Sequence, residues 1–179
     1  MSVAGTKARR ASAPSPQPVI QTVQRRRFLR ALALGATAAA SLRAATSVAA
    51  APLAITVYKS PQCGCCEGWV EHLRTNGFAV TVRNVDDTGV YRARFGIPER
   101  FGSCHTGHIA GYAIEGHVPA ADVKRLVAAR PKAVGLAVPA MPVGSPGMEQ
   151  GSRKDPFDVL LIRADGGASV FASYNRRSA

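Results

Sequence analysis

A strand–helix–strand pattern that encloses a cluster of cysteines constrains the fold of this 179-residue chain more than any other feature. The segment LAITVYK (53–59) alternates in polarity and is rich in β-formers, which predicts a strand. The next segment contains SPQCGCC, and a helix is predicted to begin there. Its apolar residues recur at positions i, i+3, i+4 and i+7, namely Cys66, Trp69, Val70 and Leu73. Gly77 is a natural helix stop, and FAVTVRNV (78–85) predicts a second strand, which a right-handed connection would make parallel to the first.

Further elements are predicted downstream. We expect a short helix over 88–96, a strand within 107–118 that reaches a turn at Glu115-Gly116, and a helix over 119–130 that opens with Pro119. A hairpin over 157–174 is predicted to turn at Asp165-Gly166-Gly167. Residues 131–156 are rich in proline and glycine and show no period. Because so long a stretch is usually functional or disordered and this one retains apolar side chains, we predict an ordered, wrapped loop.

A strand, a helix that begins at Cys-x-x-Cys and a second strand together open a thioredoxin-like fold. The segment CHTGHIAGYAIEGHVPAADVKRL (104–126) has the order of a glutaredoxin's second half, with an approach loop, a strand, a turn and a helix. This alignment brings Cys104 close to the first three cysteines. We therefore predict an α/β, thioredoxin-like domain over 50–179, with a βαβ start, then helix, strand, helix and C-terminal β-hairpin, and a long methionine-bearing loop.

Residues 1–49 have the pattern of an export signal. The segment QRRRFLRA contains Arg25, Arg26, Phe28 and Leu29 in the arrangement of a twin-arginine signal. The apolar run ALALGATAAASL (31–42) that follows is shorter than the roughly 20 residues a membrane span needs. Small residues near Ala49 suit cleavage. A membrane-anchoring helix is the alternative. The signal interpretation predicts a bacterial protein that works in the periplasm, without stable membrane insertion once the signal is removed.

The formal charge of +12 belongs mostly to that N-terminal segment. Eight of the 23 basic residues lie in 1–49 and all 11 acidic residues lie at or beyond Glu67, so the remainder carries a net charge of about +4. Because aromatics are few and no basic run follows residue 50, the composition argues against nucleic acid as a partner.

Three interpretations of the cysteines remain open on spacing alone. Cys63, Cys65 and Cys66 fall within four positions, and Cys104 lies 38 residues beyond them. Structural disulfides, such as Cys63–Cys66 with Cys65–Cys104, are common in exported proteins, although a bridge inside the cluster closes almost no loop. A redox couple of Cys63 and Cys66 at a helix N-terminus would have lowered thiol pKa values, but Cys65 would compete with it.

The third interpretation is a soft-metal site. Thiolates select Cu(I), Zn(II) and similar ions, and structural zinc sites normally show two separated ligand pairs. Adjacent thiolates instead bridge several low-coordinate Cu(I) ions, so the spacing favours copper and a multinuclear site. Apart from Met1, the only methionines are Met141 and Met148, both in the long loop, where thioethers add soft ligands or simply fill apolar gaps.

The positions of the histidines, Glu67 and Trp69 predict which of them belong to the site. His105, next to Cys104, is the histidine expected to join the site. His108 should face the opposite side of its strand, and His72 and His117 are expected to be solvated. Glu67 is expected to cap the first helix and Trp69 to lie in the core.

Three separated motifs carry a family resemblance: YKSPQCGCCEGWVEHL, FGSCHTGHIAGYAIEGHVPAADVKRL and AVPAMPVGSPGME…PFDVLLI. Together they resemble the CopG-type metal-binding proteins, exported bacterial proteins often associated with copper resistance. The resemblance spans residues 53–174 and implies a thioredoxin-like fold and copper handling in the periplasm. It also implies the ligand set Cys63, Cys65, Cys66 and Cys104.

These observations together predict a periplasmic protein that buffers or relays Cu(I). The predicted metal ligands are Cys63, Cys65, Cys66, Cys104, His105, Met141 and Met148. Its partners would be copper-exporting or copper-accepting periplasmic proteins. A thioredoxin-like oxidoreductase acting on protein disulfides or on the Cu(I)/Cu(II) couple is the alternative.

Overall fold

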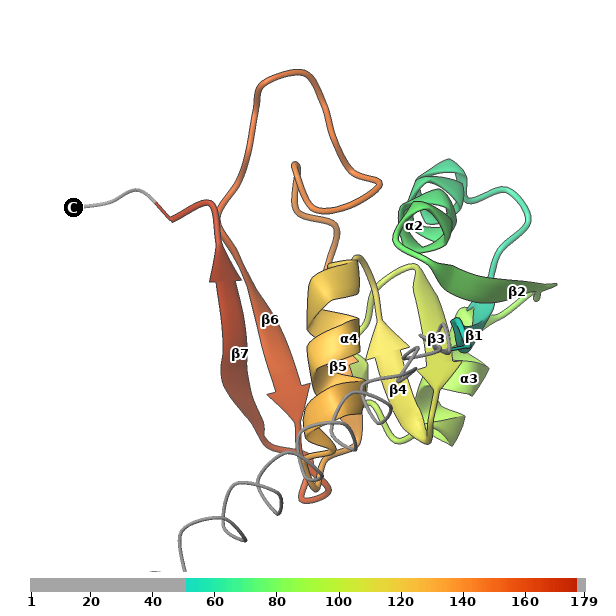
Figure 1. Ribbon diagram of the computed structural model, residues 1–179, viewed down its shortest axis with the longest axis vertical. Coiled ribbons are helices and arrows are strands. Elements are labelled where there is room, and N and C mark those ends of the chain that lie inside the picture. The colour runs from blue at the N-terminus through green and yellow to red at the C-terminus, as the bar shows by residue number, and fades with distance from the viewer. Residues whose placement is uncertain (1–50, 177–179) are drawn as a thin grey trace, which may run out of the picture. The chain divides into compact units, whose positions relative to one another are not determined.

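The computed structural model describes residues 51–176, and the predicted signal segment lies outside them. These residues form a mixed α/β structure with one seven-stranded sheet, three α-helices and a short 3-10 helix (Figure 1). The strands are β1 (Leu53–Lys59), β2 (Phe78–Asn84), β3 (His105–Ile109), β4 (Tyr112–Glu115), β5 (Gly135–Ala137), β6 (Phe157–Ile162) and β7 (Ala168–Tyr174). The helices are α2 (Gly64–Thr75), α3 (Thr88–Arg94), η1 (Glu99–Phe101) and α4 (Ala120–Ala129). No helix among the described residues is long and apolar enough to cross a membrane.

The sheet confirms the predicted βαβ start. Its strand order is β2-β1-β3-β4-β5-β6-β7. Strands β1 and β2 pair in parallel, with Leu53 opposite Phe78 and Lys59 opposite Asn84, whereas β3 is antiparallel to β1. A helix such as α2 is the usual connection between two parallel neighbouring strands, so this half of the topology follows from the sequence pattern.

Two apolar clusters lie on opposite faces of the sheet. The larger contains Ile55 and Val57 of β1 together with buried residues of α2 and α4, among them Trp69, which has no exposed surface. Alternate residues of β1 point the other way, so Tyr58 stacks on Tyr91 of α3 with ring centroids 4.0 Å apart. The predicted apolar stripe of α2 and the core position of Trp69 are confirmed.

The predicted single strand within 107–118 is wrong. That segment belongs to a hairpin in which β3 and β4 are joined at Ala110-Gly111, not at Glu115-Gly116. Both turn residues have positive φ, 49° and 87°, as a two-residue hairpin turn requires. Alanine pays about 1–2 kcal/mol for this conformation, so the sequence Ala-Gly gives little turn signal.

The predicted loop over 131–156 also contains a strand that sequence analysis missed. Residues of β5 pair in parallel with β4 and antiparallel with β6, which extends the sheet to the C-terminal hairpin. The strand has only three residues and begins at Gly135, where a Cβ atom would lie 1.8 Å from the carbonyl oxygen of Ala113. The hairpin itself, β6 to β7, is confirmed with its turn at Asp165-Gly166-Gly167.

A cysteine and histidine cluster as candidate metal centre

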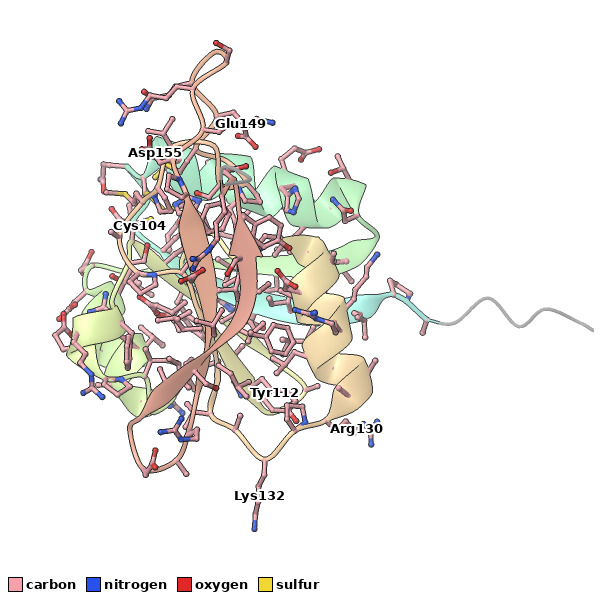
Figure 2. The ribbon with its side chains drawn as sticks, turned by 90° about the vertical axis from the view of Figure 1, so that its left-hand side faces the viewer. Cys104, Tyr112, Arg130, Lys132, Glu149 and Asp155 are labelled. Atoms are coloured by element: carbon pink, nitrogen blue, oxygen red, sulfur yellow. A yellow bond between two sulfur atoms is a disulfide. The ribbon has the colours of Figure 1, made fainter. Side chains whose placement is uncertain are left out.

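The four cysteine sulfurs converge at the N-terminal end of α2. Cys63 is the N-cap residue of α2, Cys65 and Cys66 lie in its first turn, and Cys104 directly precedes β3. All four Sγ atoms lie within 4.8 Å of one another. Figure 2 places Cys104 at the same end of the domain as Glu149 and Asp155 of the long loop, far from Lys132. The expected approach of Cys104 to the other cysteines is confirmed.

The four cysteines are not equivalent. A disulfide joins Cys63 to Cys66, whereas Cys65 and Cys104 are free thiols. The Sγ atom of Cys65 lies 3.4 Å from that of Cys63 and 3.8 Å from that of Cys104. One bridge of the structural-disulfide hypothesis is therefore present, and the other, Cys65–Cys104, is not.

Two buried imidazoles complete the cluster. The Sγ atom of Cys104 lies 3.3 Å from Nδ1 of His105 and 3.3 Å from Nε2 of His117. The second nitrogen of each ring meets a backbone carbonyl, Gly116 O at 3.0 Å from His105 Nε2 and Pro146 O at 2.8 Å from His117 Nδ1. Because a carbonyl oxygen only accepts, these nitrogens carry the protons and both remaining lone pairs face the Cys104 sulfur. Such outer hydrogen bonds fix the tautomer of metal-binding histidines in proteins.

Burial sets the protonation states at the cluster. Desolvation, reinforced by His117, lowers the pKa of His105 to about 3, and burial likewise lowers the pKa of His117. Burial and the neighbouring Cys65 thiol raise the pKa of Cys104 to about 12. The metal-free cluster therefore holds neutral imidazoles and a protonated thiol at neutral pH. Binding of a thiophilic metal would release that proton.

These pKa shifts predict that the metal-free protein loses stability as the pH falls from about 7 to about 5. The ordinary pKa of histidine is 6.5, whereas that of His105 in the folded chain is about 3, so the unfolded chain binds more protons between these values. His105 should lower the unfolding free energy by about 1.4 kcal/mol for each pH unit between 6.5 and its folded-state pKa, and His117 adds to the loss in the same direction. Urea denaturation at several pH values measures the slope, and His105→Gln should reduce it. An unfolding free energy that is constant over this range would contradict the prediction.

The histidines that sequence analysis treated as solvated are placed differently. His117 has no exposed surface and is a member of the cluster, so its expected exposure is wrong. His72 is half-buried, and its Nε2 accepts a hydrogen bond from the Ala120 N–H at the start of α4. His108 faces away from His105 as expected and stacks on Phe95, whereas His105 packs on Trp69.

Glu67 does not cap α2. The cap position belongs to Cys63, whose side chain makes no capping hydrogen bond. Glu67 instead lies one position beyond the third helical residue, and its carboxylate binds Nζ of the fully buried Lys59 at 2.8 Å. Lys59 ends β1 and also donates to Ser60 O at 3.0 Å, which places a buried ammonium beside the cysteine-bearing turn.

The methionine-bearing loop packs over the cluster through its backbone. The Cβ atom of an alanine at Gly147 would lie 2.5 Å from the Trp69 nitrogen and 2.9 Å from the Cys65 oxygen, so this part of the loop touches the first turns of α2. Figure 1 shows the loop between β5 and β6 passing beside α2. Met141 is 48 % exposed and lines a pocket of about 420 Å³ with Pro142, Phe157 and Leu160. Met148 is partly buried at a turn in which its N–H donates to Ser145 O.

The fold and the cluster define an α/β protein with a candidate soft-metal site of four cysteines and two histidines. Comparisons with known proteins agree with this class. The family described as "Protein of unknown function, DUF411" matches residues 101–148, which contain Cys104, His105 and His117. A comparison with curated proteins found no match.

Two solved structures are similar to this chain. One is titled "Copper resistance protein copG- Form 2", with 51% sequence identity and a TM-score of 0.67, and the match covers 69% of this chain and 99% of that one. The other, "Copper resistance protein copG- Form 1", has 51% identity and a TM-score of 0.66, with 69% and 98% covered. The chain therefore belongs to the CopG-type copper resistance family.

Proposed function

We propose that this protein buffers or relays Cu(I) through its cysteine thiolates and so contributes to copper resistance. The observation that carries the proposal is the convergence of the four cysteine sulfurs within 4.8 Å, with two tautomer-fixed imidazoles facing Cys104. The names of the two similar structures support copper as the metal. We infer that Cys63, Cys65, Cys66, Cys104 and His105 are ligands, as the sequence predicts, and we add His117.

The donor set favours Cu(I) over harder ions. Thiolate and imidazole are soft to intermediate donors, and neither of the two donor groups found among the described residues includes a carboxylate. The thiols of Cys65 and Cys66 are adjacent in sequence, and adjacent thiolates are better placed to bridge two metal ions than to occupy two corners of one tetrahedron. A multinuclear Cu(I) site is part of the proposal. It requires the Cys63–Cys66 disulfide to be reduced first.

The two methionines enter the proposal as accessory soft ligands for transfer. Met141 is exposed, and it follows Ala140, whose carbonyl oxygen accepts a hydrogen bond of 2.6 Å from the Ser103 hydroxyl. Ser103 in turn precedes Cys104. The Met141 thioether is therefore exposed and lies next to a residue that contacts Ser103, the neighbour of Cys104. This position suits an exchange of Cu(I) with copper-exporting or copper-accepting proteins. Met148, on the same loop, is the second accessory candidate.

Location and domain organisation are proposed from the sequence. A twin-arginine-type signal over 1–49 would export the domain of residues 50–179 to the periplasm. We further propose that the domain is thioredoxin-like. The run of elements from β1 to α4, the sheet order β2-β1-β3-β4 and the parallel pairing of β1 with β2 support this assignment.

Anaerobic titration of the reduced protein with Cu(I) against a competing chelator tests the copper proposal. We expect tight binding in the natural chain and a large loss of affinity in the variant with Cys63→Ser, Cys65→Ser and Cys66→Ser. An affinity that is the same in both proteins would contradict a thiolate site.

A second candidate function is that of an oxidoreductase, which the Cys63–Cys66 disulfide at the start of α2 favours. Reduction of that disulfide takes two electrons and two protons from a donor such as a protein dithiol, which becomes a disulfide. Insulin-disulfide reduction and a defined dithiol potential would support the thiol version. Turnover of Cu(I) and Cu(II) with an electron donor would support the copper version, and the absence of both activities would exclude this candidate.

A further inference from the structure

A fully buried carboxylate lies directly behind the cluster. Glu115, the last residue of β4, has no exposed surface. Three donors converge on its two oxygens: Arg92 Nε at 2.8 Å, the Ser103 N–H at 2.7 Å and the Thr106 hydroxyl at 2.6 Å. A buried carboxylate is costly unless it is paired and hydrogen-bonded, and Glu115 satisfies both conditions.

The bonds of this carboxylate enclose the segment that carries two of the proposed ligands. Ser103 immediately precedes Cys104, and Thr106 immediately follows His105. Arg92 of α3 holds the same segment from a second direction, because its Nη2 donates to Ser103 O at 2.8 Å. Both backbone polar groups of Ser103 are therefore fixed by the Arg92–Glu115 pair.

The backbone that follows Glu115 ties the third proposed ligand, His117, to the same segment. His117 lies two residues after Glu115, and Gly116 between them has φ +70°. A Cβ atom at Gly116 would lie 2.7 Å from Ser103 Cβ and 2.5 Å from Val138 O, so this backbone runs directly against the Ser103 segment. The Gly116 N–H donates to His105 O at 3.0 Å. Segments 103–106 and 115–117 thus form one rigid unit with Glu115 at its centre.

The stability of the fold alone does not explain why the buried Arg92–Glu115 ion pair is present. Replacing a buried ion pair with apolar side chains of similar volume is often neutral or stabilising. Arg92 is almost fully buried and is further tied by its Nη1 to Glu99 at 2.6 and 2.7 Å. What the pair provides, and apolar side chains would not, is a set of directed hydrogen bonds on both sides of Cys104-His105.

We propose that Glu115, held by Arg92, is a positioning residue that fixes Cys104, His105 and His117 as a metal-binding group. The inference rests on the proposed copper function. Outer-sphere partners of this kind typically contribute about 10- to 100-fold to metal affinity. The glutamine of Glu115→Gln offers one acceptor oxygen to three donors, so it should loosen the unit without changing its volume.

The test compares Glu115→Gln with Asp122→Asn in the full chain. Asp122 is a matched control, because it is also a buried carboxylate that accepts from an arginine and a hydroxyl, namely Arg125 and Tyr174. None of these groups belongs to segments 103–106 or 115–117. Competitive Cu(I) titration should show an affinity about 10- to 100-fold lower for Glu115→Gln and unchanged for Asp122→Asn.

A second readout needs no metal. With Cys65→Ser and the Cys63–Cys66 disulfide intact, Cys104 is the one free thiol of the chain. Its alkylation by iodoacetamide should become several-fold faster with Glu115→Gln, because loosening the segment exposes a thiol that is only partly buried in the natural chain, and should stay unchanged with Asp122→Asn. If Glu115→Gln does not fold, Thr106→Val removes a single bond to the carboxylate and should shift both readouts in the same direction.

The two failures are distinguishable. Absence of Cu(I) binding in the natural chain would refute the proposed function, while the alkylation rates would still decide whether Glu115 positions Cys104. Normal Cu(I) binding with equal affinities and equal alkylation rates in the Glu115 and Asp122 variants would overturn the positioning role alone.

Discussion

Cys104→Ser is expected to lower the Cu(I) affinity of the protein by more than any other single substitution. Cys104 is the one residue common to both donor groups, the four cysteines and the set of Cys104, His105 and His117. Its sulfur lies 3.8 Å from that of Cys65 and 3.3 Å from each imidazole. Losing a direct ligand should lower the Cu(I) affinity by more than losing an outer-sphere partner does, which is about 10- to 100-fold.

The oxidation state sharpens this prediction. In the protein with the Cys63–Cys66 disulfide, only Cys65 and Cys104 retain thiols, so Cys104→Ser leaves a single thiol and should remove whatever Cu(I) binding that form has. In the reduced protein three thiols remain, and the same substitution should lower the affinity strongly. Competitive titration of both redox forms measures the effect. His108→Gln, on the opposite face of β3, is the control and should leave the affinity unchanged. Equal affinities for Cys104→Ser and the natural chain in the reduced form would contradict the ligand assignment.

Gly147→Ala is expected to detach the methionine-bearing loop from α2. Gly147 has φ +82°, and a Cβ atom there would meet the backbone of Gly68 and Trp69 at 2.8 and 2.5 Å. Backbone atoms of a helix do not move aside, so the loop must shift, and with it Pro146 O, which fixes the tautomer of His117. Chemical denaturation should show a loss of several kcal/mol, made up of about 1–2 kcal/mol for the left-handed conformation and about 1–3 kcal/mol for the clash.

Gly151→Ala separates these two contributions. Gly151 lies on the same loop with φ +57°, but a Cβ atom there would meet nothing within 4 Å. This variant should show only the destabilisation that comes from the left-handed conformation and should keep the natural Cu(I) affinity. If Gly147→Ala is no more destabilising than Gly151→Ala, the close packing of the loop on α2 is not a determinant of stability.

The first half of the fold could be predicted because its signals are local. Strand β1, the apolar stripe of α2 and strand β2 each follow from a short periodic pattern, and Gly77 marks the end of the helix. Strand β5 could not be predicted, since three residues carry no period and their pairing depends on β4 and β6, which lie far away in sequence.

His117 was missed for a related reason. In the observed hairpin Thr106 lies opposite Glu115, and continuing this register by two residues places His117 across from Cys104. The sequence prediction places the turn at Glu115-Gly116 instead. With that turn, Thr106 and Glu115 are no longer paired, and His117 falls in a loop. Ala110-Gly111 would have revealed the correct hairpin, but alanine is an uncommon residue at positive φ. His105 needed no register, because it is adjacent to Cys104 in sequence.

X-ray absorption at the copper edge of the Cu(I)-loaded, reduced protein tests the central claim most directly. A site built from Cys63, Cys65, Cys66 and Cys104 predicts a first shell dominated by sulfur, with a smaller nitrogen contribution that decreases in His117→Ala. It also predicts that the sulfur contribution falls sharply in Cys65→Ser with Cys104→Ser. A first shell of nitrogen and oxygen alone, or a sulfur shell that is unchanged in the double cysteine variant, would contradict the account.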